Sequence, residues 1–228
     1  MRQDETCWTV VRGAVDGDPA ARSRFAETYL TVVRAYLGAR WRGHAAGERL
    51  DDAVQDVFFD CFKHGGALRR LDQDRRVAFR TFLYGVVRNV ALRYEERGAK
   101  QRERQPPSAF DPEGVPEDGD RLSKTFDRAW ASALIARAAA RQRAAAEVDG
   151  EDAQRRIDLL RLRFSDGLPI REIAKQWDED PARLHHEYAK AREEFKAALR
   201  EEVAYHDPGG AGVVEHEVAE LLTLLQRD

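Results

Sequence analysis

Apolar residues recur along this chain at the three- and four-residue spacing of an amphipathic helix, in one segment after another. The clearest case is Phe79–Arg104, where one side is apolar over most of the segment. The same spacing returns in about Cys7–Trp41, in Leu50–Gly66, from Arg121 onward and in Pro181–Val203. No clean alternation of apolar and polar residues, bounded by turn residues, indicates a strand. The pattern therefore predicts an all-α protein.

A proline-rich acidic segment divides the helical pattern. Residues 105–120 contain four of the eight prolines and five acidic residues without a basic one, so they are read as a linker. We expect a helical domain at 1–104 and a second one at 121–203. Residues 204–228 are a C-terminal extension, with a short helix predicted by Val214, Val218, Leu221, Leu222 and Leu225. That helix either restrains one of the chain's own domains or completes the core of the second domain.

The outer side of Leu50–Gly66 combines acidic residues with an aromatic one. Its members are Asp52, Gln55, Asp56 and Phe59. Such a surface is unusual for plain solvent, and a partner protein would explain it. Asp52 and Asp56 are also one turn apart, where two carboxylates could share a divalent cation. An acidic helix start favoured by the helix dipole is the third explanation.

The segment Phe79–Arg104 carries a concentrated positive charge. From Arg75 to Arg104 nine residues are Arg or Lys and three are Glu, whereas the whole chain has a net charge of −3. Outside the apolar side lie Arg80, Tyr84, Arg88 and Asn89, with Arg93 and Arg97 further on. Such a surface can hold phosphates, stack on bases and bind base edges. A solvated basic surface is the simpler alternative.

The second half contains the layout of a helix-turn-helix. A short apolar-patterned segment ends at Trp177, Asp178-Glu179 is a turn, and Asp180-Pro181 begins a longer helix. The outer residues of that second helix are Arg183, His185, His186, Lys190 and Arg192. In DNA-binding proteins the second helix of this layout enters the major groove. Adjacent histidines diverge on a helix, which disfavours a metal site at this position.

Composition narrows the class of protein. The 228 residues are 43% hydrophobic and 35% charged. The sequence shows neither a signal peptide nor an apolar run long enough to span a membrane. We therefore expect a cytoplasmic protein that does not insert into a membrane. Cys7 and Cys61 stand alone, without the spacing of a zinc site. No catalytic triad, phosphate loop or metal cluster is found. We therefore expect no enzyme activity, no cofactor and no metal.

Two motifs in the first half resemble those of bacterial RNA polymerase sigma factors of the extracytoplasmic-function type. DDAVQDVF is similar to the family's (D/E)DxxQ(D/E)VF helix, and FRTFLYGVVRNVAL is similar to its FRxWLxxIARNxAL helix. The resemblance implies that Asp52, Gln55, Asp56 and Phe59 contact the β′ clamp helices of core RNA polymerase. It also implies that the minus-ten element of promoter DNA is bound by Arg80, Tyr84, Arg88, Asn89, Arg93 and Arg97. The loop at residues 67–78 would hold a flipped-out base.

The resemblance continues in the second half. GLPIREIAKQW is similar to the family's GLSxxEIAxxL, with Pro169 in place of the capping Ser or Thr. The family typically has Gly, an apolar residue and a basic residue at three later positions, where this chain has Asp178, Glu179 and Glu187 respectively. The implied role is contact with the β flap and with the minus-thirty-five element, through Arg183, His185, His186, Lys190 and Arg192. The resemblance leaves room for an anti-sigma factor or another regulator as a further partner.

Two other classes stay open at this point. One is a stand-alone helix-turn-helix regulator or a polymerase adaptor. The other, more remote, is a helical metal-dependent enzyme that uses Asp51, Asp52 and Asp56, although a second Asp-rich motif is missing from the sequence.

Overall fold

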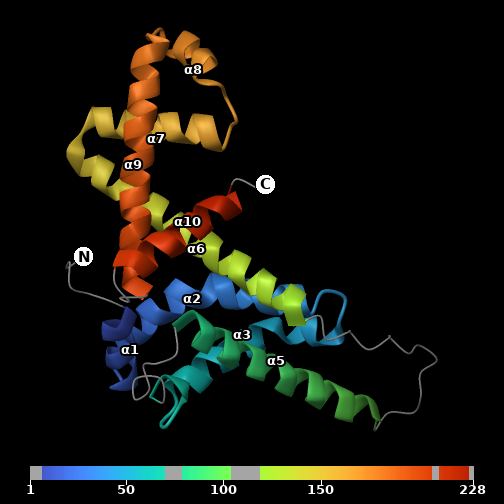
Figure 1. Ribbon diagram of the computed structural model, residues 1–228. Helices are drawn as coiled ribbons and strands as arrows, with labels where there is room; N and C mark the ends of the chain where they lie inside the picture. Colours follow the sequence, from blue (N-terminus) through green and yellow to red (C-terminus); the bar gives the residue numbers. More distant parts are fainter. Residues whose placement is uncertain (1–6, 70–78, 104–118, 207–210, 226–228) are drawn as a thin grey trace. The chain divides into compact units, whose positions relative to one another are not determined.

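The computed structural model describes residues 7–69, 79–103, 119–206 and 211–225, and every regular element among them is helical. In chain order (Figure 1) these are α1 (Cys7–Val15), α2 (Pro19–Arg40), the 3-10 helix η1 (Ala45–Arg49), α3 (Leu50–Phe62), α5 (Phe79–Glu103), α6 (Gly119–Asp149), α7 (Glu151–Phe164), α8 (Ile170–Trp177), α9 (Pro181–His206) and α10 (Ala211–Leu225). The predicted all-α fold is confirmed. None of the described helices is both long and apolar enough to cross a membrane.

The chain forms two units, and the division between them falls inside α6. The first unit is Met1–Ala133 and the second is Leu134–Asp228. Residues 121–133, which we expected in the second domain, therefore belong to the first. The reason is aromatic packing, because Phe126 lies 6.0 Å from Tyr36 and Trp130 lies 5.9 Å from Tyr29 between ring centroids. The proline-rich residues 105–118 lie outside the described part of the chain.

Aromatic side chains of α2, α3 and α5 fill the core of the first unit. Phe25 of α2 is buried, with its ring 5.4 Å from Phe62 and 5.9 Å from Phe79. Asp18 is the N-cap of α2, and its carboxylate accepts hydrogen bonds from the backbone N–H groups of Ala20 and Ala21, as expected for an N-cap followed by proline. The apolar spacing of α2, α3 and α5 thus corresponds to one continuous core.

Both cysteines belong to this core. Cys7 and Cys61 are both buried. Burial raises the pKa of the Cys61 thiol to about 12, and the neighbouring Asp60 carboxylate acts in the same direction.

In the second unit α7, α8 and α9 surround a small apolar cluster. Its buried members are Leu159, Ile170, Ile173, Ala174 and Leu184. Asp178 caps the C-terminus of α8 in the left-handed conformation (φ 52°, ψ 49°), and the Glu179 N–H donates to Ala174 O at 3.0 Å. α9 follows at once, with the Asp180 carboxylate accepting from the Ala182 N–H. These elements form the helix-turn-helix predicted from the sequence.

A buried carboxylate joins α6 to α9 within the second unit. Glu202 is only 2% exposed, and it accepts hydrogen bonds from Arg137 Nε at 2.8 Å and Arg141 Nη2 at 2.7 Å. Burial alone would raise the pKa of Glu202, but the two guanidinium groups hold it below its usual value. His206, one turn later, has its Nδ1 2.8 Å from the backbone carbonyl oxygen of Glu202. Because a carbonyl oxygen can only accept, Nδ1 is the protonated ring nitrogen and donates this hydrogen bond. Burial lowers the pKa of His206 to about 4.

The C-terminal helix α10 packs against α9. Val214, Val218 and Leu221 are buried, whereas the side chain of Val213 is exposed. Glu215 pairs with Arg200 of α9. The described part of the extension therefore contributes to the core of the second unit.

Candidate functional site

α3 keeps three of its four candidate residues on its solvent side. Ala53, Val54, Val57 and Cys61 point into the core, which leaves Asp52, Gln55 and Phe59 exposed. Phe59 is the extreme case, with 64% of its surface exposed. Its ring lies 6.0 Å from Lys63 Nζ, a loose cation–π contact. A large aromatic side chain exposed to this degree, between polar groups, is typical of the centre of a protein–protein interface.

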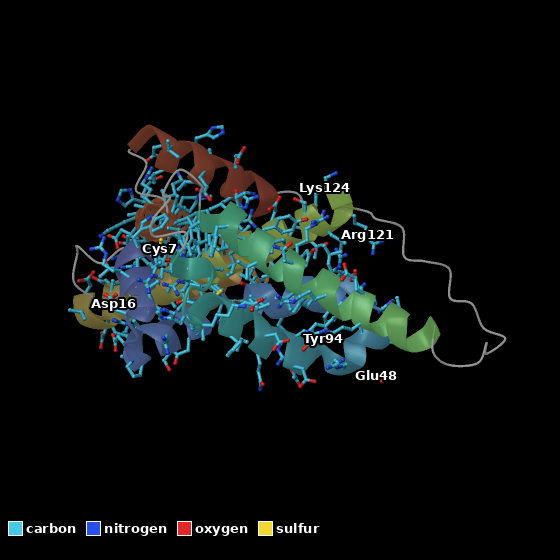
Figure 2. The ribbon with its side chains drawn as sticks, turned by 90° about the horizontal axis from the view of Figure 1, so that it is seen from below. Cys7, Asp16, Glu48, Tyr94, Arg121 and Lys124 are labelled. Carbon is cyan, nitrogen blue, oxygen red and sulfur yellow. The ribbon has the colours of Figure 1, made fainter. Side chains whose placement is uncertain are left out.

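Asp56, the fourth candidate, has a contact within the protein instead. Its side chain is half-buried and accepts a 3.0 Å hydrogen bond from the Tyr94 hydroxyl of α5. Burial raises the pKa of Tyr94, and the hydrogen bond to Asp56 raises it further. Figure 2 labels Tyr94 on α5 and Glu48 of η1. The guanidinium carbon of Arg49, also in η1, lies 4.9 Å from the centre of the Tyr94 ring. Asp56 therefore helps to hold α3 against α5.

The acidic residues at the start of α3 are engaged with arginines. Asp51 pairs with Arg34 of α2 at 2.5 Å, and Asp52 lies 3.8 Å from Arg49. Within the described ranges, no group of three or more His, Cys, Asp or Glu side chains is arranged to hold a metal ion. The arrangement at Asp51 and Asp52 is one of ion pairs between carboxylates and guanidinium groups.

The candidate residues of α5 form two rows that point in different directions. Arg80, Tyr84 and Arg88 follow one another at four-residue spacing, and a second row, turned away from the first, contains Asn89, Arg93 and Arg97. Of the six, Arg88, Asn89 and Arg97 are exposed, and the other three are partly buried. The side chains of Lys100 and Arg102, and residues 70–78 of the expected base-holding loop, lie outside the described part.

The first row meets the beginning of α6. Arg80 forms an ion pair with Asp127, with Nη2 at 2.5 Å and Nε at 3.1 Å from Oδ1. The ring of Tyr84 lies edge-on to Phe126 at 5.3 Å and to Tyr36 at 5.6 Å. Two candidate DNA contacts are thus occupied by side chains of this unit.

The second row meets α3. Arg93 forms an ion pair with Asp60, which also pairs with Lys63. Burial would raise the pKa of Asp60, but Lys63 and Arg93 hold it below its usual value. Arg97 lies 5.7 Å from the centre of the Tyr94 ring. Arg93 therefore connects the two motif-bearing helices, and its charge is partly neutralised.

A hydrogen-bonded network that the sequence analysis missed fixes α2 to α5. Glu95 of α5 accepts from Arg40 Nε at 2.7 Å and from Trp41 Nε1 at 2.9 Å. Burial would raise the pKa of Glu95, whereas these donors lower it, and the Glu95 carboxylate raises the pKa of Arg40. Glu95 appeared only as one of three acids within a basic segment, so no local signal separated it from the others.

In the second unit the candidate residues lie on the open side of α9. Arg183, His185, His186, Lys190 and Arg192 are all exposed. Arg183 is 3.5 Å from Glu179, and the guanidinium of Arg192 lies 5.8 Å from the ring of Tyr188.

Two of the three unexpected acids of this helix-turn-helix, Glu179 and Glu187, have ion-pair partners. Glu179 also pairs with Arg155 of α7 at 2.8 Å, and Glu187 lies 3.5 Å from the largely buried Arg156, which also binds Glu194 at 2.9 Å. Glu179 therefore connects the turn before α9 to α7, and Glu187 connects α9 itself to α7. They line a shallow pocket of about 120 Å³ together with Arg155, Arg156 and Trp177.

Comparison with known proteins adds no assignment, because a scan against protein-family models finds no match and a search of curated proteins finds no significant relative.

Proposed function

We propose that this chain is a sigma factor of the extracytoplasmic-function type, which directs core RNA polymerase to promoters and helps to open the minus-ten element in the bacterial cytoplasm. The first unit would bind the β′ clamp helices through α3 and the minus-ten element through α5. The second unit would bind the β flap and the minus-thirty-five element through α9. The protein itself would be a specificity subunit without catalytic residues.

The exposed side of α3 is the observation that carries this proposal. Asp52, Gln55 and Phe59 make no contribution to the core, and they are the residues that the sigma-factor motif assigns to polymerase. Asp56 belongs to the same motif, but its hydrogen bond to Tyr94 gives it a role in folding as well. The proposed contact surface is therefore Asp52, Gln55 and Phe59.

Two further arrangements support the proposal. Arg88 and Asn89 are exposed on α5, where cationic and amide groups can hold the phosphates and base edges of an opened strand. The exposed basic residues of α9 lie on the second helix of a helix-turn-helix, the position that enters the major groove in proteins with this motif.

The test is promoter-directed transcription with and without this protein. Run-off transcription with core RNA polymerase, on the DNA upstream of the protein's own gene, should give a specific transcript only when the protein is added. Phe59→Ala should abolish that transcript and weaken binding to core polymerase roughly thirtyfold, the effect of removing one interface hot spot. Because Phe59 is exposed, its removal should change the free energy of unfolding by less than about 0.5 kcal/mol.

Leu30→Ala is the matched control for this test. Leu30 is another exposed apolar residue of the first unit, at 40% exposure, and it lies on α2 outside the proposed contact surface. Polymerase binding should be unchanged in this variant. Equal binding of core polymerase by Phe59→Ala and wild type would contradict the proposed function.

A stand-alone helix-turn-helix regulator is the second candidate, favoured by the exposed basic residues of α9. The two functions differ in whether DNA binding depends on polymerase. A regulator would bind its DNA site with the same affinity in the presence and absence of the core enzyme, whereas the proposed sigma factor would bind a promoter specifically only as part of the holoenzyme.

A further inference from the structure

The beginning of α6 occupies part of the surface through which α5 is proposed to bind promoter DNA. We define the covering segment as residues 121–133, which belong to the first unit together with α5. Figure 2 labels Arg121 and Lys124 on the first turns of this helix. The segment reaches α2 and α5 chiefly through side chains, by way of aromatic rings and one ion pair.

The ion pair neutralises a proposed DNA contact. The Asp127 carboxylate accepts from both Nη2 and Nε of Arg80, the same edge of the guanidinium that would bind a phosphate. The side chains of Arg80 and Asp127 are 39% and 37% exposed, so water and salt reach the pair. A pair of this kind is weak enough to be exchanged for a phosphate.

The aromatic contact blocks a second group. The ring of Tyr84 lies against Phe126, and Phe126 is fully buried between Tyr84 and Tyr36. Trp130, one turn further on, stacks against Tyr29 with the two ring planes 3° apart. The buried rings keep the covering segment in place, and Tyr84 cannot stack on a base from its covered side while Phe126 is there.

We propose that the covering segment competes with promoter DNA for Arg80 and Tyr84, so that DNA binding by the free protein is restrained until this segment is displaced. The inference rests on the proposed function, because that function assigns Arg80 and Tyr84 to DNA. Asp127 takes the place of a phosphate and Phe126 takes the place of an unstacked base. Promoter DNA in the complex with polymerase would exchange with both.

The test uses the full-length protein alone and a short, fluorescently labelled single-stranded DNA of mixed sequence. Asp127→Asn removes the competing charge and keeps the shape of the side chain. It should bind the DNA about threefold to fivefold more tightly, the range expected for a half-exposed ion pair. The plot of log affinity against log salt should become steeper by about 0.7, because Arg80 gains a phosphate contact.

Two further variants separate this mechanism from a general change of charge. Glu96→Gln makes the same change of charge at an exposed position of α5, and it should have a smaller effect. In an Arg80→Gln background the additional Asp127→Asn substitution should have no effect, because its consequence passes through Arg80. Three outcomes would overturn the inference. They are no gain of affinity for the DNA in Asp127→Asn, a gain only as large as that of Glu96→Gln, and a gain that persists in the Arg80→Gln background.

Hydrogen exchange of the covering segment provides a second measurement in case Asp127→Asn disturbs folding. In the wild-type protein, saturating DNA should increase exchange in residues 121–133, because the segment leaves its site. Unchanged or slower exchange would overturn the inference. Neither measurement uses polymerase, so a sigma factor that transcribes normally but shows none of these effects would keep its proposed function and lose only this mechanism of restraint.

Discussion

Asp178 holds the turn between α8 and α9 in a backbone conformation that glycine adopts more easily than any other residue. Its φ of 52° is the only positive value at a non-glycine residue in the described part of the chain. Aspartate tolerates this conformation better than most side chains, because its short polar group can bond locally. This explains how the turn forms without the glycine that is typical of the sigma-factor motif.

Substitutions at Asp178 should follow the cost of the left-handed conformation. We expect Asp178→Gly to raise the free energy of unfolding by about 0.5 kcal/mol, and Asp178→Val to lower it by about 1–2 kcal/mol. Asp178→Asn should differ from wild type by less than about 0.5 kcal/mol. Urea unfolding followed by circular dichroism measures all three, and an equally stable valine variant would refute the explanation.

His206 should make the second unit sensitive to acid. Its pKa is about 4 in the folded protein, and an exposed histidine in the unfolded chain titrates near 6.5. Because the unfolded chain binds the proton more tightly, the stabilisation is complete above about pH 6.5 and is lost as the pH falls towards 4. The lost free energy is roughly 3 kcal/mol, from a difference of between two and three pKa units.

His206→Gln isolates this contribution. The variant keeps a polar side chain but cannot titrate, so its stability should fall less than that of the wild type between pH 7 and about pH 4.5. Arg137 and Glu202, which face the histidine, are present in both proteins, so their own titration cancels in the comparison. Parallel pH dependence of unfolding in the two proteins would show that His206 is not the titrating group.

At the scale of elements, α10 provides a comparison between two valines of the same helix. Val218 is buried and Val213 is 46% exposed. Val218→Asp should destabilise the protein by about 2–3 kcal/mol, because it places an unpaired charge in the core, whereas Val213→Asp should change stability by less than about 0.5 kcal/mol. Thermal unfolding measures both, and equal melting temperatures would show that α10 does not depend on this packing.

The helices themselves could be predicted because each keeps one apolar side over several turns. The prediction was most accurate where local signals mark an end, as Asp18-Pro19 does for α2 and Asp180-Pro181 does for α9. The division within α6 is a feature that the sequence pattern does not mark. Phe126 and Trp130 have the same helical spacing as Leu134, so local spacing could not reveal that they pack with a different unit.

The candidate sites were predictable to different degrees. Phe59 could be placed on the solvent side of α3, since Val54, Val57 and Cys61 already account for the apolar side. The hydrogen bond from Tyr94 to Asp56 joins residues 38 positions apart, and the pair of Arg80 with Asp127 joins residues 47 positions apart. Such partners depend on tertiary packing, which local sequence does not specify.

At the scale of the whole molecule, the burial of both cysteines has a consequence for labelling chemistry. Maleimide reagents react with the thiolate, and Cys61, with its pKa raised to about 12, holds almost none of it at neutral pH. Cys7 is shielded by burial in the same core. A cysteine introduced on an exposed surface, such as Asn89→Cys, should therefore take up a dye selectively in the folded wild-type background, which makes this chain suitable for fluorescence experiments without removal of its native thiols.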